Sequence, residues 1–375
     1  MDIKIIPNEL FGEVKAIPSK SVLHRALIVS SISQKQNIKL SNVDMISDDV
    51  LATINCLQAL GAKIETESNN IYVRSIENIS DETYIDCKES GTTLRLLLPL
   101  LSMFSKSTIV DCKESLRDRP IIELIETLKN SGVCFESEVF PIRVFGNATG
   151  TLFKIKGDIS SQYISGLLLL SALMEQETTV FLTTPLESGN YVDMTIDILK
   201  DFGITVKEKE NSFVVFGGRR LIKSPNKYVV EGDWSNAAFF IVAGCLGRTL
   251  KINGLNFDSI QGDKQIIDIL KKIGGIKNME SIHKIVDSVN GFLWGKNILV
   301  FMLIGAAIYF SFKTKFMQFR LFHKIVKVLF KNEKGKHGIS SLETFFLGTA
   351  CRVGAGNIAG VVAAISVGGA GSIFW

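Results

Sequence analysis

The chain has 375 residues, with 42 Lys and Arg against 38 Asp and Glu, and a mean hydropathy of +0.25. A content of 46% hydrophobic and 21% charged residues excludes a disordered chain, and a net charge of +4 is too small to indicate nucleic-acid binding. These averages combine two unlike parts: residues 279–375 carry a net charge of +7, 11 of the 24 Phe and no Pro, whereas residues 1–278 carry −3.

The N-terminus and the cysteines indicate a reducing compartment. Residues 1–7 have no long apolar stretch and no small-residue cleavage site, so we expect no signal peptide. The six cysteines form no Cys-x-x-Cys pair, which predicts buried free thiols without a metal site or a disulfide framework. His24 is the sole histidine of residues 1–278, which excludes catalysis by paired histidines there.

A repeat with a period of 71 residues predicts an α/β architecture. Each of four glycines, Gly61, Gly132, Gly203 and Gly274, ends a Leu-x-x-x-Gly segment that follows an amphipathic helical pattern. We expect each glycine to cap its helix in a left-handed conformation, although four generic helix ends are the alternative. Alternating strands follow the first three, and residues 204–216 predict a hairpin turning near 210–211. No hairpin pattern follows Gly274, so the repeat is expected to stop near Ile276.

Short polar segments predict where the repeated helices begin. Candidate caps or first-turn residues are Ser47 with Asp48 and Asp49, Arg119 with Pro120, Asp193, and Asp263.

Four short segments combine small hydroxyl residues or glycine with a nearby cation or tyrosine, and a fifth, residues 116–120, carries two arginines, which favours anion binding. A strand end, a hydroxyl turn and a helix start present backbone N–H groups to an anion, and Lys or Arg adds charge. Each segment alone is typical of a helix cap or a surface ion pair, but their order along the repeat indicates one site. The segments are residues 18–25, 89–95, 116–120, 160–163 and 188–191.

These segments resemble the enolpyruvylshikimate-phosphate (EPSP) synthase family, the 3-phosphoshikimate 1-carboxyvinyltransferases of the shikimate pathway. The resemblance covers roughly residues 1–275. The related enolpyruvyl transferase family that acts on UDP-N-acetylglucosamine is the alternative, but its Asn after the first Lys and its catalytic Cys loop are missing. The matching motifs are Pro18-Ser-Lys-Ser-x-x-His-Arg25, Ser47-Asp-Asp49, Ser90-Gly-Thr-Thr-Leu-Arg95, Arg117-Asp-Arg-Pro120, Ser160-Ser-Gln162, Glu231-Gly-Asp-Trp-Ser235 and Gln261-Gly-Asp263.

The resemblance implies a two-domain fold of six βαβαββ units, about four of which are present. Residues 16–225 would form the first domain from three units, and residues 1–15 with 226–275 would form part of the second. In the family the 5-hydroxyl of shikimate 3-phosphate adds to C2 of phosphoenolpyruvate, and the tetrahedral intermediate then loses phosphate. The resemblance implies neither a cofactor nor a metal.

Matching positions imply a set of substrate-binding residues. Phosphoenolpyruvate would be held by Lys20, Gly91, Arg119 and Gln162. Shikimate 3-phosphate would be held by Ser21, Arg25, Ser160, Ser161, Ser188 and Tyr191. Two roles stay open for Arg95: contact with the substrate, or a structural ion pair with Asp49.

The catalytic residues stay unassigned. The family's catalytic Asp and its Lys-Glu segment lie in its last two repeats, which the sequence lacks, so we expect weak substrate binding and little turnover. A substrate-binding pseudo-enzyme is a further interpretation.

The tail predicts a membrane segment. Residues 297–312 are uncharged, lie between Lys296 and Lys313, and precede a basic loop that the positive-inside rule places in the cytoplasm. Residues 353–375 carry no charge and six glycines, which favours a broken membrane helix. A buried core helix at 297–312 and a surface-bound amphipathic helix at 319–330 are the alternatives.

The tail looks like the N-terminal hundred or so residues of the alanine or glycine:cation symporter family. The resemblance rests on Arg352-Val-Gly-Ala-Gly-Asn-Ile-Ala-Gly360 and Gly368-Gly-Ala-Gly-Ser-Ile-Phe-Trp375. It implies that Gly354, Gly356 and Asn357 border an ion and substrate path. We expect residues 1–275 in the cytoplasm and residues 279–375 in the lipid bilayer. The orientation of the basic loop conflicts with that arrangement, which favours an accidental join of two fragments over an evolved bifunctional protein.

Overall fold

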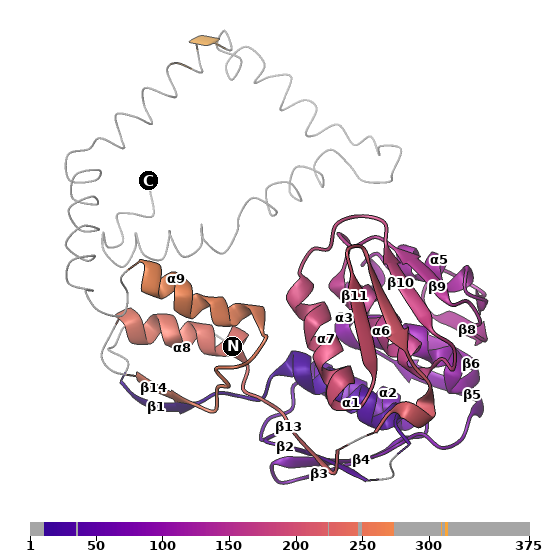
Figure 1. Cartoon of the computed structure of the whole chain (residues 1–375), viewed down its shortest axis with the longest axis horizontal. Helices are drawn as coiled ribbons and strands as arrows, with labels where there is room; N and C mark the ends of the chain where they lie inside the picture. Colours follow the sequence, from indigo (N-terminus) through magenta and orange to yellow (C-terminus); the bar gives the residue numbers. More distant parts are fainter. Residues whose placement is uncertain are drawn as a thin grey trace, which may run out of the picture. The chain divides into compact units, whose positions relative to one another are not determined.

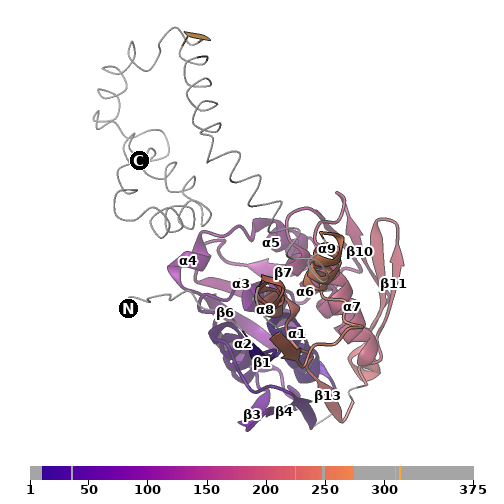
Figure 2. The ribbon, with the colours of Figure 1, turned by 90° about the vertical axis from the view of Figure 1, so that its left-hand side faces the viewer.

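The computed structural model describes residues 11–34, 37–223, 225–246, 250–273, 309 and 312–313. The chain divides into two compact units, Met1–Met279 and Glu280–Trp375. Almost all described residues belong to the first unit, which Figures 1 and 2 show as a mixed array of helices and strands. The α/β class predicted from the sequence is therefore confirmed for this unit.

Two βαβαββ units follow one another in the middle of the chain. In each, two parallel strands are followed by an antiparallel hairpin, and the sheet orders are β5-β6-β8-β7 and β9-β10-β12-β11. The first unit comprises β5 (Ser80–Asp86), α3 (Gly91–Leu97), the short helix η1 (Leu98–Met103), β6 (Ser105–Asp111), α4 (Glu114–Arg117), α5 (Ile122–Lys129), β7 (Val133–Phe135) and β8 (Ile142–Gly146). The second comprises β9 (Leu152–Ile155), α6 (Ser161–Leu173), β10 (Thr178–Leu182), α7 (Gly189–Asp201), β11 (Thr205–Lys209) and β12 (Ser212–Phe216).

A third sheet of the same design takes its outer strand from a distant part of the chain. Its order is β13-β2-β4-β3, so β13 occupies the position that β5 and β9 hold in the other sheets. The elements are α1 (Lys20–Ile32), β2 (Ile38–Ser41), α2 (Asp48–Ala59), β3 (Lys63–Glu67) and β4 (Asn70–Arg74), with η2 (Arg219–Leu221) and β13 (Lys227–Val229) arriving after β12. We call the three four-stranded sheets and their helices the first lobe.

A smaller set of elements, the second lobe, forms a partial fourth unit. It contains β1 (Gly12–Lys15), α8 (Trp234–Leu246), β14 (Leu250–Asn253), η3 (Gly262–Gln265) and α9 (Ile266–Lys272). β1 pairs in parallel with β14, so the beginning of the described chain completes a strand pair near its end. Figure 2 views this lobe with α8, α9 and β1 in front.

Two connections join the lobes and run side by side. Pro18 and Gly232 form an antiparallel bridge, Ser19 N donates to Glu231 O at 2.8 Å, and Asp233 N donates to Ile17 O at 2.8 Å. We call these two segments, residues 16–19 and 230–233, the paired crossover.

The capping glycines confirm the repeat. Gly61, Gly132 and Gly203 all have positive φ, at 106°, 102° and 83°, and follow the ends of α2 (Ala59), α5 (Lys129) and α7 (Asp201) within two or three residues. A Cβ atom at Gly132 would lie 2.9 Å from Asn147 O, so that position excludes a side chain. The hairpin predicted at 204–216 is confirmed as β11 and β12, whereas Gly274 lies outside the described residues.

The predicted helix starts are confirmed in part. Ser47 caps α2, with Asp48 and Asp49 in its first turn, and Asp263 lies in the first turn of η3. The prediction for Asp193 is wrong, because α7 already begins at Gly189 and Asp193 lies inside it. Arg119 and Pro120 are not caps either, since α5 begins at Ile122 after Ile121.

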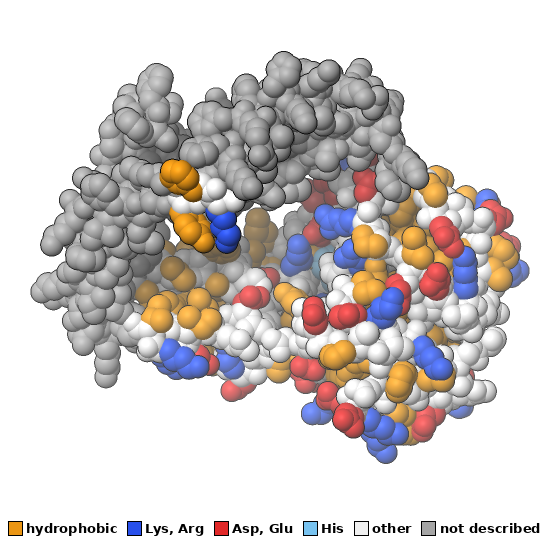
Figure 3. Space-filling view, turned by 90° about the horizontal axis from the view of Figure 1, so that it is seen from above, with side chains coloured by type: hydrophobic (Ala, Val, Ile, Leu, Met, Phe, Trp, Pro, Cys, Tyr) orange, Lys and Arg blue, Asp and Glu red, His pale blue; other side chains and the backbone are white. Residues whose placement is uncertain are grey.

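Burial and charge differ between the lobes. One continuous apolar core runs through the first lobe, where α1 and α6 are buried along nearly their whole length. Figure 3 shows acidic and basic side chains interspersed over this lobe, and hydrophobic side chains gathered over the second. The described cysteines are unpaired, as predicted, but Cys134 is exposed and Cys245 half-buried, so the prediction of burial is wrong for these two.

The predicted membrane segments at 297–312 and 353–375 lie almost wholly outside the described residues, as do Gly354, Gly356 and Asn357. Among the described residues, no helix combines the length and apolar character needed to cross a membrane.

Candidate active site

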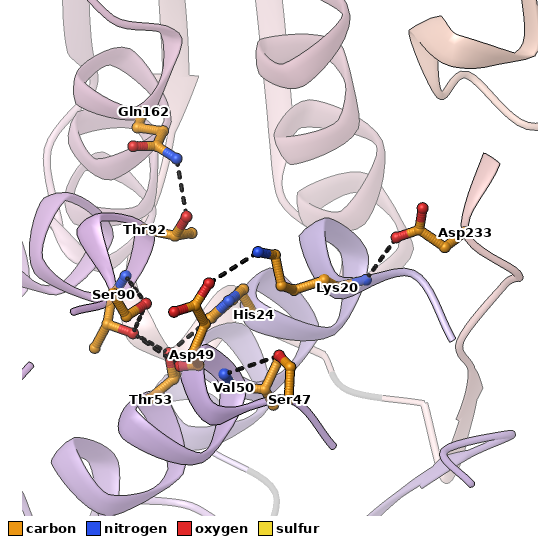
Figure 4. A network of polar contacts seen from close by, with 11 residues as sticks. Lys20, His24, Ser47, Asp49, Val50, Thr53, Ser90, Thr92, Gln162 and Asp233 are labelled. Carbon is orange, nitrogen blue, oxygen red and sulfur yellow. Dashed lines mark hydrogen bonds and ion pairs between the residues drawn. The ribbon is translucent and has the colours of Figure 1, made fainter. Parts of the chain in front are cut away.

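Four helices begin with a serine cap on the face where the predicted site residues lie. The hydroxyl oxygens of Ser19, Ser47, Ser90 and Ser160 accept hydrogen bonds from backbone N–H groups in the first turns of α1, α2, α3 and α6. The N-terminal end of a helix carries partial positive charge. α1, α2, α3 and α6 contact one another in sequence, so these ends share a face that favours anions; Figure 4 shows Ser47 and Ser90 on it.

Lys20 opens α1 and lies between two carboxylates. Its Nζ forms an ion pair of 2.8 Å with Asp49 Oδ2, and its backbone N donates to Asp233 Oδ2 at 3.2 Å. The lysine side chain is about half exposed, at 48%. An arriving anion therefore finds the ammonium group accessible and oriented by Asp49 (Figure 4).

Gly91 provides close backbone access beside two guanidinium groups. A Cβ atom at this position would lie 3.4 Å from Nη1 of Arg119 and 3.4 Å from Nη1 of Arg95. The structure thus brings together Gly91 and Arg119, both predicted to hold phosphoenolpyruvate, and Arg95, which belongs to the same motif as Gly91. Arg119 is exposed, so its guanidinium is available to a ligand.

Arg95 does not pair with Asp49, which corrects the structural alternative proposed for it. Its Nη1 donates to Gln162 Oε1 at 2.9 Å, and its Nε is buried without a partner. Asp49 instead forms its ion pair with Lys20, at the start of α1. Gln162 also donates through Nε2 to Thr92 Oγ1 at 2.9 Å, which links α6 to α3 (Figure 4).

Arg25 is a buried cation surrounded by neutral oxygen atoms. Only 2% of the residue is exposed, and its guanidinium donates to Thr195 Oγ1 at 2.7 Å, to Tyr191 O at 3.0 Å and to Ser21 O at 2.9 Å. Burial lowers the pKa of Arg25 to about 10, and Tyr191 opposes this shift. The ion pairs formed by the described residues do not include Arg25, so a bound anion nearby would compensate its charge.

The remaining predicted residues lie at the starts of α6 and α7. Ser160, Ser161 and Gln162 are all half-buried at the α6 end. Ser188 has a left-handed φ of 55° before α7, and Tyr191 is 38% exposed while its carbonyl accepts from Arg25. Hydrogen bonds therefore connect the α7 residues to α1, and those of α6 to α3.

A buried hydrogen-bond network beneath Lys20 was not predicted from the sequence. His24 Nδ1 lies 2.7 Å from Thr53 Oγ1, which lies 2.6 Å from Thr93 Oγ1, and Thr93 Oγ1 donates to Ser90 Oγ at 2.7 Å. Burial lowers the pKa of His24 to about 3, so the ring is neutral. The network joins α1, α2 and α3 at their first two turns (Figure 4). Its sequence signal was the position of His24 between Ser21 and Arg25.

Gln261 is a second residue whose role was missed. It is 5% exposed, and its Nε2 donates to Glu231 Oε1 at 2.7 Å and to Gly232 O at 2.9 Å. Its Oε1 accepts from Trp234 N at 3.1 Å and from Ser19 Oγ at 3.2 Å. The quoted motifs at 231–235 and 261–263 contained the signal, because both now meet at the paired crossover.

A cavity of about 370 Å³ opens beside the crossover. It is lined by residues of both lobes, among them Lys20, Ser47 and Val50 of the first and Asp233, Asn236 and Phe239 around the start of α8. The described residues contain no group of three or more His, Cys, Asp or Glu side chains suited to a metal ion.

Two family models match parts of the chain. The family model described as EPSP synthase (3-phosphoshikimate 1-carboxyvinyltransferase) matches residues 5–318. The model of the sodium:alanine symporter family matches residues 279–375, so the two matches overlap at 279–318.

Curated relatives carry the name 3-phosphoshikimate 1-carboxyvinyltransferase. The chain is 37% identical over 294 residues to one from Clostridium perfringens, covering 76% of this chain and 69% of the relative. It is 39% identical over 287 residues to one from Clostridium botulinum, covering 74% of this chain and 66% of the relative.

Solved structures share the fold. The EPSP synthase of Acinetobacter baumannii has a TM-score of 0.60 at 24% identity, covering 72% of this chain and 60% of that one. The enolpyruvyl transferase NikO of Streptomyces tendae has a TM-score of 0.56 at 17% identity, covering 71% and 63%. The chain thus spans about 60% of these structures' length.

Proposed function

Because the chain belongs to the EPSP synthase family, we propose that its first lobe binds shikimate 3-phosphate and phosphoenolpyruvate, the substrates of enolpyruvyl transfer. The observation that carries this proposal is the accessible Lys20 ammonium among serine-capped helix starts. Both substrates are polyanions, and charge-assisted hydrogen bonds to phosphate and carboxylate are the strong ones.

Each of the two substrates is proposed to be bound by its own group of residues. Phosphoenolpyruvate lies against the accessible cations, held by Lys20, Gly91, Arg119 and Gln162. Shikimate 3-phosphate lies across the starts of α1, α6 and α7, held by Ser21, Arg25, Ser160, Ser161, Ser188 and Tyr191. The contact of Gly91 with the Arg119 guanidinium and the bond from Arg25 to Tyr191 O support these two groups.

The transfer itself is proposed to be impaired. The catalytic carboxylates and the lysine that the family uses are assigned to repeats beyond residue 275, and no residue of the chain is assigned to that role. Residues 16–225 form the proposed first domain, and residues 1–15 with 226–275 part of the second. Residues 1–275 are proposed to act in the cytoplasm.

A second candidate function rests on the symporter match at 279–375. In this alternative the tail is a membrane fragment in the lipid bilayer, with Gly354, Gly356 and Asn357 along an ion path, and residues 1–275 are a passenger. Partition of the purified chain into detergent or vesicles tests the membrane assignment, and a chain that stays soluble without detergent contradicts it.

Calorimetric titration with shikimate 3-phosphate tests the proposed site. We expect saturable binding that is weaker than in a full-length relative, and about fivefold to tenfold weaker still in Ser161→Ala, which removes one hydroxyl donor. Ser137→Ala is the matched control, because Ser137 lies in an exposed turn away from the site. Equal heats for shikimate and shikimate 3-phosphate, or equal losses in both variants, contradict the proposal.

Turnover is measured separately as phosphate release from both substrates together. We expect release close to the uncatalysed background, because binding without a proton donor and acceptor gives little rate enhancement. Turnover near that of a full-length relative contradicts the proposed impairment while leaving the binding site intact.

A further inference from the structure

One face of α1 meets α2 in two matched contacts. Lys20 and His24 lie one helical turn apart on α1, and each contacts a residue of α2. Lys20 Nζ lies 2.8 Å from Asp49 Oδ2, and we call this contact the outer rung. One turn further along, His24 Nδ1 lies 2.7 Å from Thr53 Oγ1, and we call this contact the inner rung (Figure 4). Both rungs join residues 29 positions apart, so they share one register between the two helices.

The outer rung alone is too weak to hold the Lys20 ammonium in place. Its two side chains are 48% and 33% exposed, and an exposed ion pair between flexible side chains contributes little to stability. The inner rung differs, because His24 and Thr53 are both fully buried. Without the inner rung α1 can shift against α2, and the outer rung loses its geometry.

The inner rung continues into α3 as a chain of buried hydroxyl groups. Thr53 Oγ1 lies 2.6 Å from Thr93 Oγ1. Thr93 Oγ1 lies in turn 2.7 Å from Ser90 Oγ and 3.2 Å from the backbone O of Asp49. Ser90 caps α3 directly before Gly91. The chain therefore ends at the residue that pairs with Lys20 and at the helix start that presents Gly91.

The burial of His24 Nε2 sets the direction of this chain. Nε2 meets no hydrogen-bond partner among the described residues, and a buried N–H group without a partner is rare because its hydration is lost. The neutral ring therefore carries its proton on Nδ1, which donates to Thr53 Oγ1. Thr53 then donates to Thr93. Thr93 donates to Ser90 or to the backbone O of Asp49, so every donor points away from α1.

We infer that His24 is a positioning residue for phosphoenolpyruvate. Through Thr53 it sets the register of α1 against α2, and with it the position of the Lys20 ammonium. Through Thr93 it holds the start of α3, where Gly91 lies. His24 is buried beneath Lys20, so it acts through these residues and not by contact with the ligand. This role rests on the proposed function, which places phosphoenolpyruvate against Lys20 and Gly91.

The neighbouring face of α1 supplies an internal control. Ser21 and Arg25 lie one turn apart on this face. The Arg25 guanidinium points to α7, where it donates to Thr195 Oγ1 at 2.7 Å and to Tyr191 O at 3.0 Å. Ser21, Arg25 and Tyr191 belong to the group proposed for shikimate 3-phosphate, and neither rung includes them. Loss of the inner rung should therefore weaken binding of phosphoenolpyruvate more than binding of shikimate 3-phosphate.

Calorimetric titration of the full chain with each ligand tests this difference. Thr53→Val keeps the shape of the side chain and removes its hydroxyl. It should weaken phosphoenolpyruvate binding by at least about fivefold and shikimate 3-phosphate binding by less than about twofold. Thr108→Val is the matched control, because Thr108 is also fully buried and its hydroxyl has no partner among the described residues. It should leave both affinities unchanged.

Two substitutions of His24 separate hydrogen bonding from packing. In His24→Asn the amide nitrogen can occupy the place of Nδ1 and donate to Thr53. In His24→Gln the longer side chain carries its amide to the place of Nε2. We expect His24→Asn to keep most of the affinity for phosphoenolpyruvate and His24→Gln to lose as much as Thr53→Val. Equal losses in the two His24 variants would indicate a packing role and overturn the inference.

NMR measures both rungs without a ligand. The nitrogen-15 shifts of the His24 ring should show the proton on Nδ1. Nitrogen-15 relaxation of the lysine ammonium groups should show Lys20 less ordered in Thr53→Val than in the wild type, and unchanged in Thr108→Val. A proton on Nε2, or a Lys20 ammonium as ordered in Thr53→Val as in the wild type, overturns the inference.

The two proposals fail in distinguishable ways. A wild-type chain that binds neither ligand refutes the proposed function, and the order of the Lys20 ammonium then still decides whether His24 positions it. A wild-type chain that binds both ligands, with Thr53→Val binding phosphoenolpyruvate as tightly or losing both affinities equally, refutes the inference alone.

Discussion

The helices α6 and α8 begin equivalent repeat units and are both apolar on all sides, yet one is a core helix and the other is not. α6 is surrounded by α3, α7 and the sheet of its own unit, so all its residues from Tyr163 onward are buried. α8 contacts β14, η3 and α9; Phe239 is 77% exposed, and residues 240–245 are only half-buried. The comparison shows that the burial of an apolar helix depends on the neighbouring repeats, because one repeat alone cannot cover its own apolar helix.

The largest expected difference between α6 and α8 is in the free energy of unfolding lost when one large side chain in each helix is truncated. Leu168→Ala in α6 should lower the free energy of unfolding by about 2–5 kcal/mol, because Leu168 is fully buried and its loss leaves a cavity. Phe239→Ala in α8 should change it by less than about 0.5 kcal/mol, because the ring is already exposed. Urea denaturation measures both, and equal losses break the comparison.

Replacing one glycine by alanine in each helix should again destabilise α6 more than α8, with a smaller difference in the free energy of unfolding. A Cβ atom at Gly166 would lie 2.5 Å from Arg95 O, so Gly166→Ala should force α6 away from α3 and cost about 1–3 kcal/mol. At Gly244 in α8 the nearest atom is Leu250 Cβ at 3.2 Å, and the alanine's higher helix propensity offsets that contact. A Gly244→Ala chain that melts as early as Gly166→Ala contradicts the open state of α8.

Low pH should reduce the stability of the first lobe because of His24. The hydrogen-bond network around Gln261 contains no histidine, so the same effect is not expected there. The pKa of His24 is lowered to about 3 by burial, so the unfolded chain binds a proton that the folded chain excludes between about pH 6.5 and pH 3. Stability is therefore complete above pH 6.5 and falls with pH by up to about 1.4 kcal/mol per unit, or about 2 kcal/mol by pH 5. His24→Gln removes this dependence, and parallel pH profiles of wild type and variant would argue against it.

Surface ion pairs should give the smallest effect and no difference between the lobes. Lys106 pairs with Asp81 at 2.6 Å on the first lobe, and Lys251 with Glu13 at 3.0 Å on the second, all on exposed side chains. Solvent and salt screen such pairs, so Lys106→Ala and Lys251→Ala should both leave the melting temperature nearly unchanged. A large loss for Lys251→Ala alone would show that the β1–β14 pair depends on that contact, and would sharpen the comparison.

The predictable part of the fold is local. The sequence pattern predicted three features correctly: the period of 71 residues, the left-handed glycines and the hairpin of β11 and β12. Each of them depends on residues that are neighbours in the sequence. The start of α7 was placed wrongly because Ser188 enters the helix through a left-handed turn that the acidic residue Asp193 did not indicate. Likewise the ion-pair partner of Asp49 depends on tertiary structure: Asp49 pairs with Lys20, whereas Arg95 donates to Gln162.

In the candidate site, too, local sequence motifs could be predicted and long-range contacts could not. The cations and hydroxyls stood out in the sequence because they cluster in short motifs. The roles of His24 and Gln261 emerged only when α1, α2 and the crossover segments lay together, since their partners are 27 to 242 residues away along the chain. Which predicted residues contact a substrate stays a prediction that the titrations above address.

The pairing of β1 with β14 sets a delay during synthesis of the chain. Lys15 lies opposite Asn253, so β1 leaves the ribosome about 240 residues before its partner strand exists. At about 5–20 residues per second, that interval is roughly 12–48 seconds. Throughout it the first lobe can assemble its β5 and β9 sheets, while β1 remains a free strand edge open to chaperones or to wrong partners.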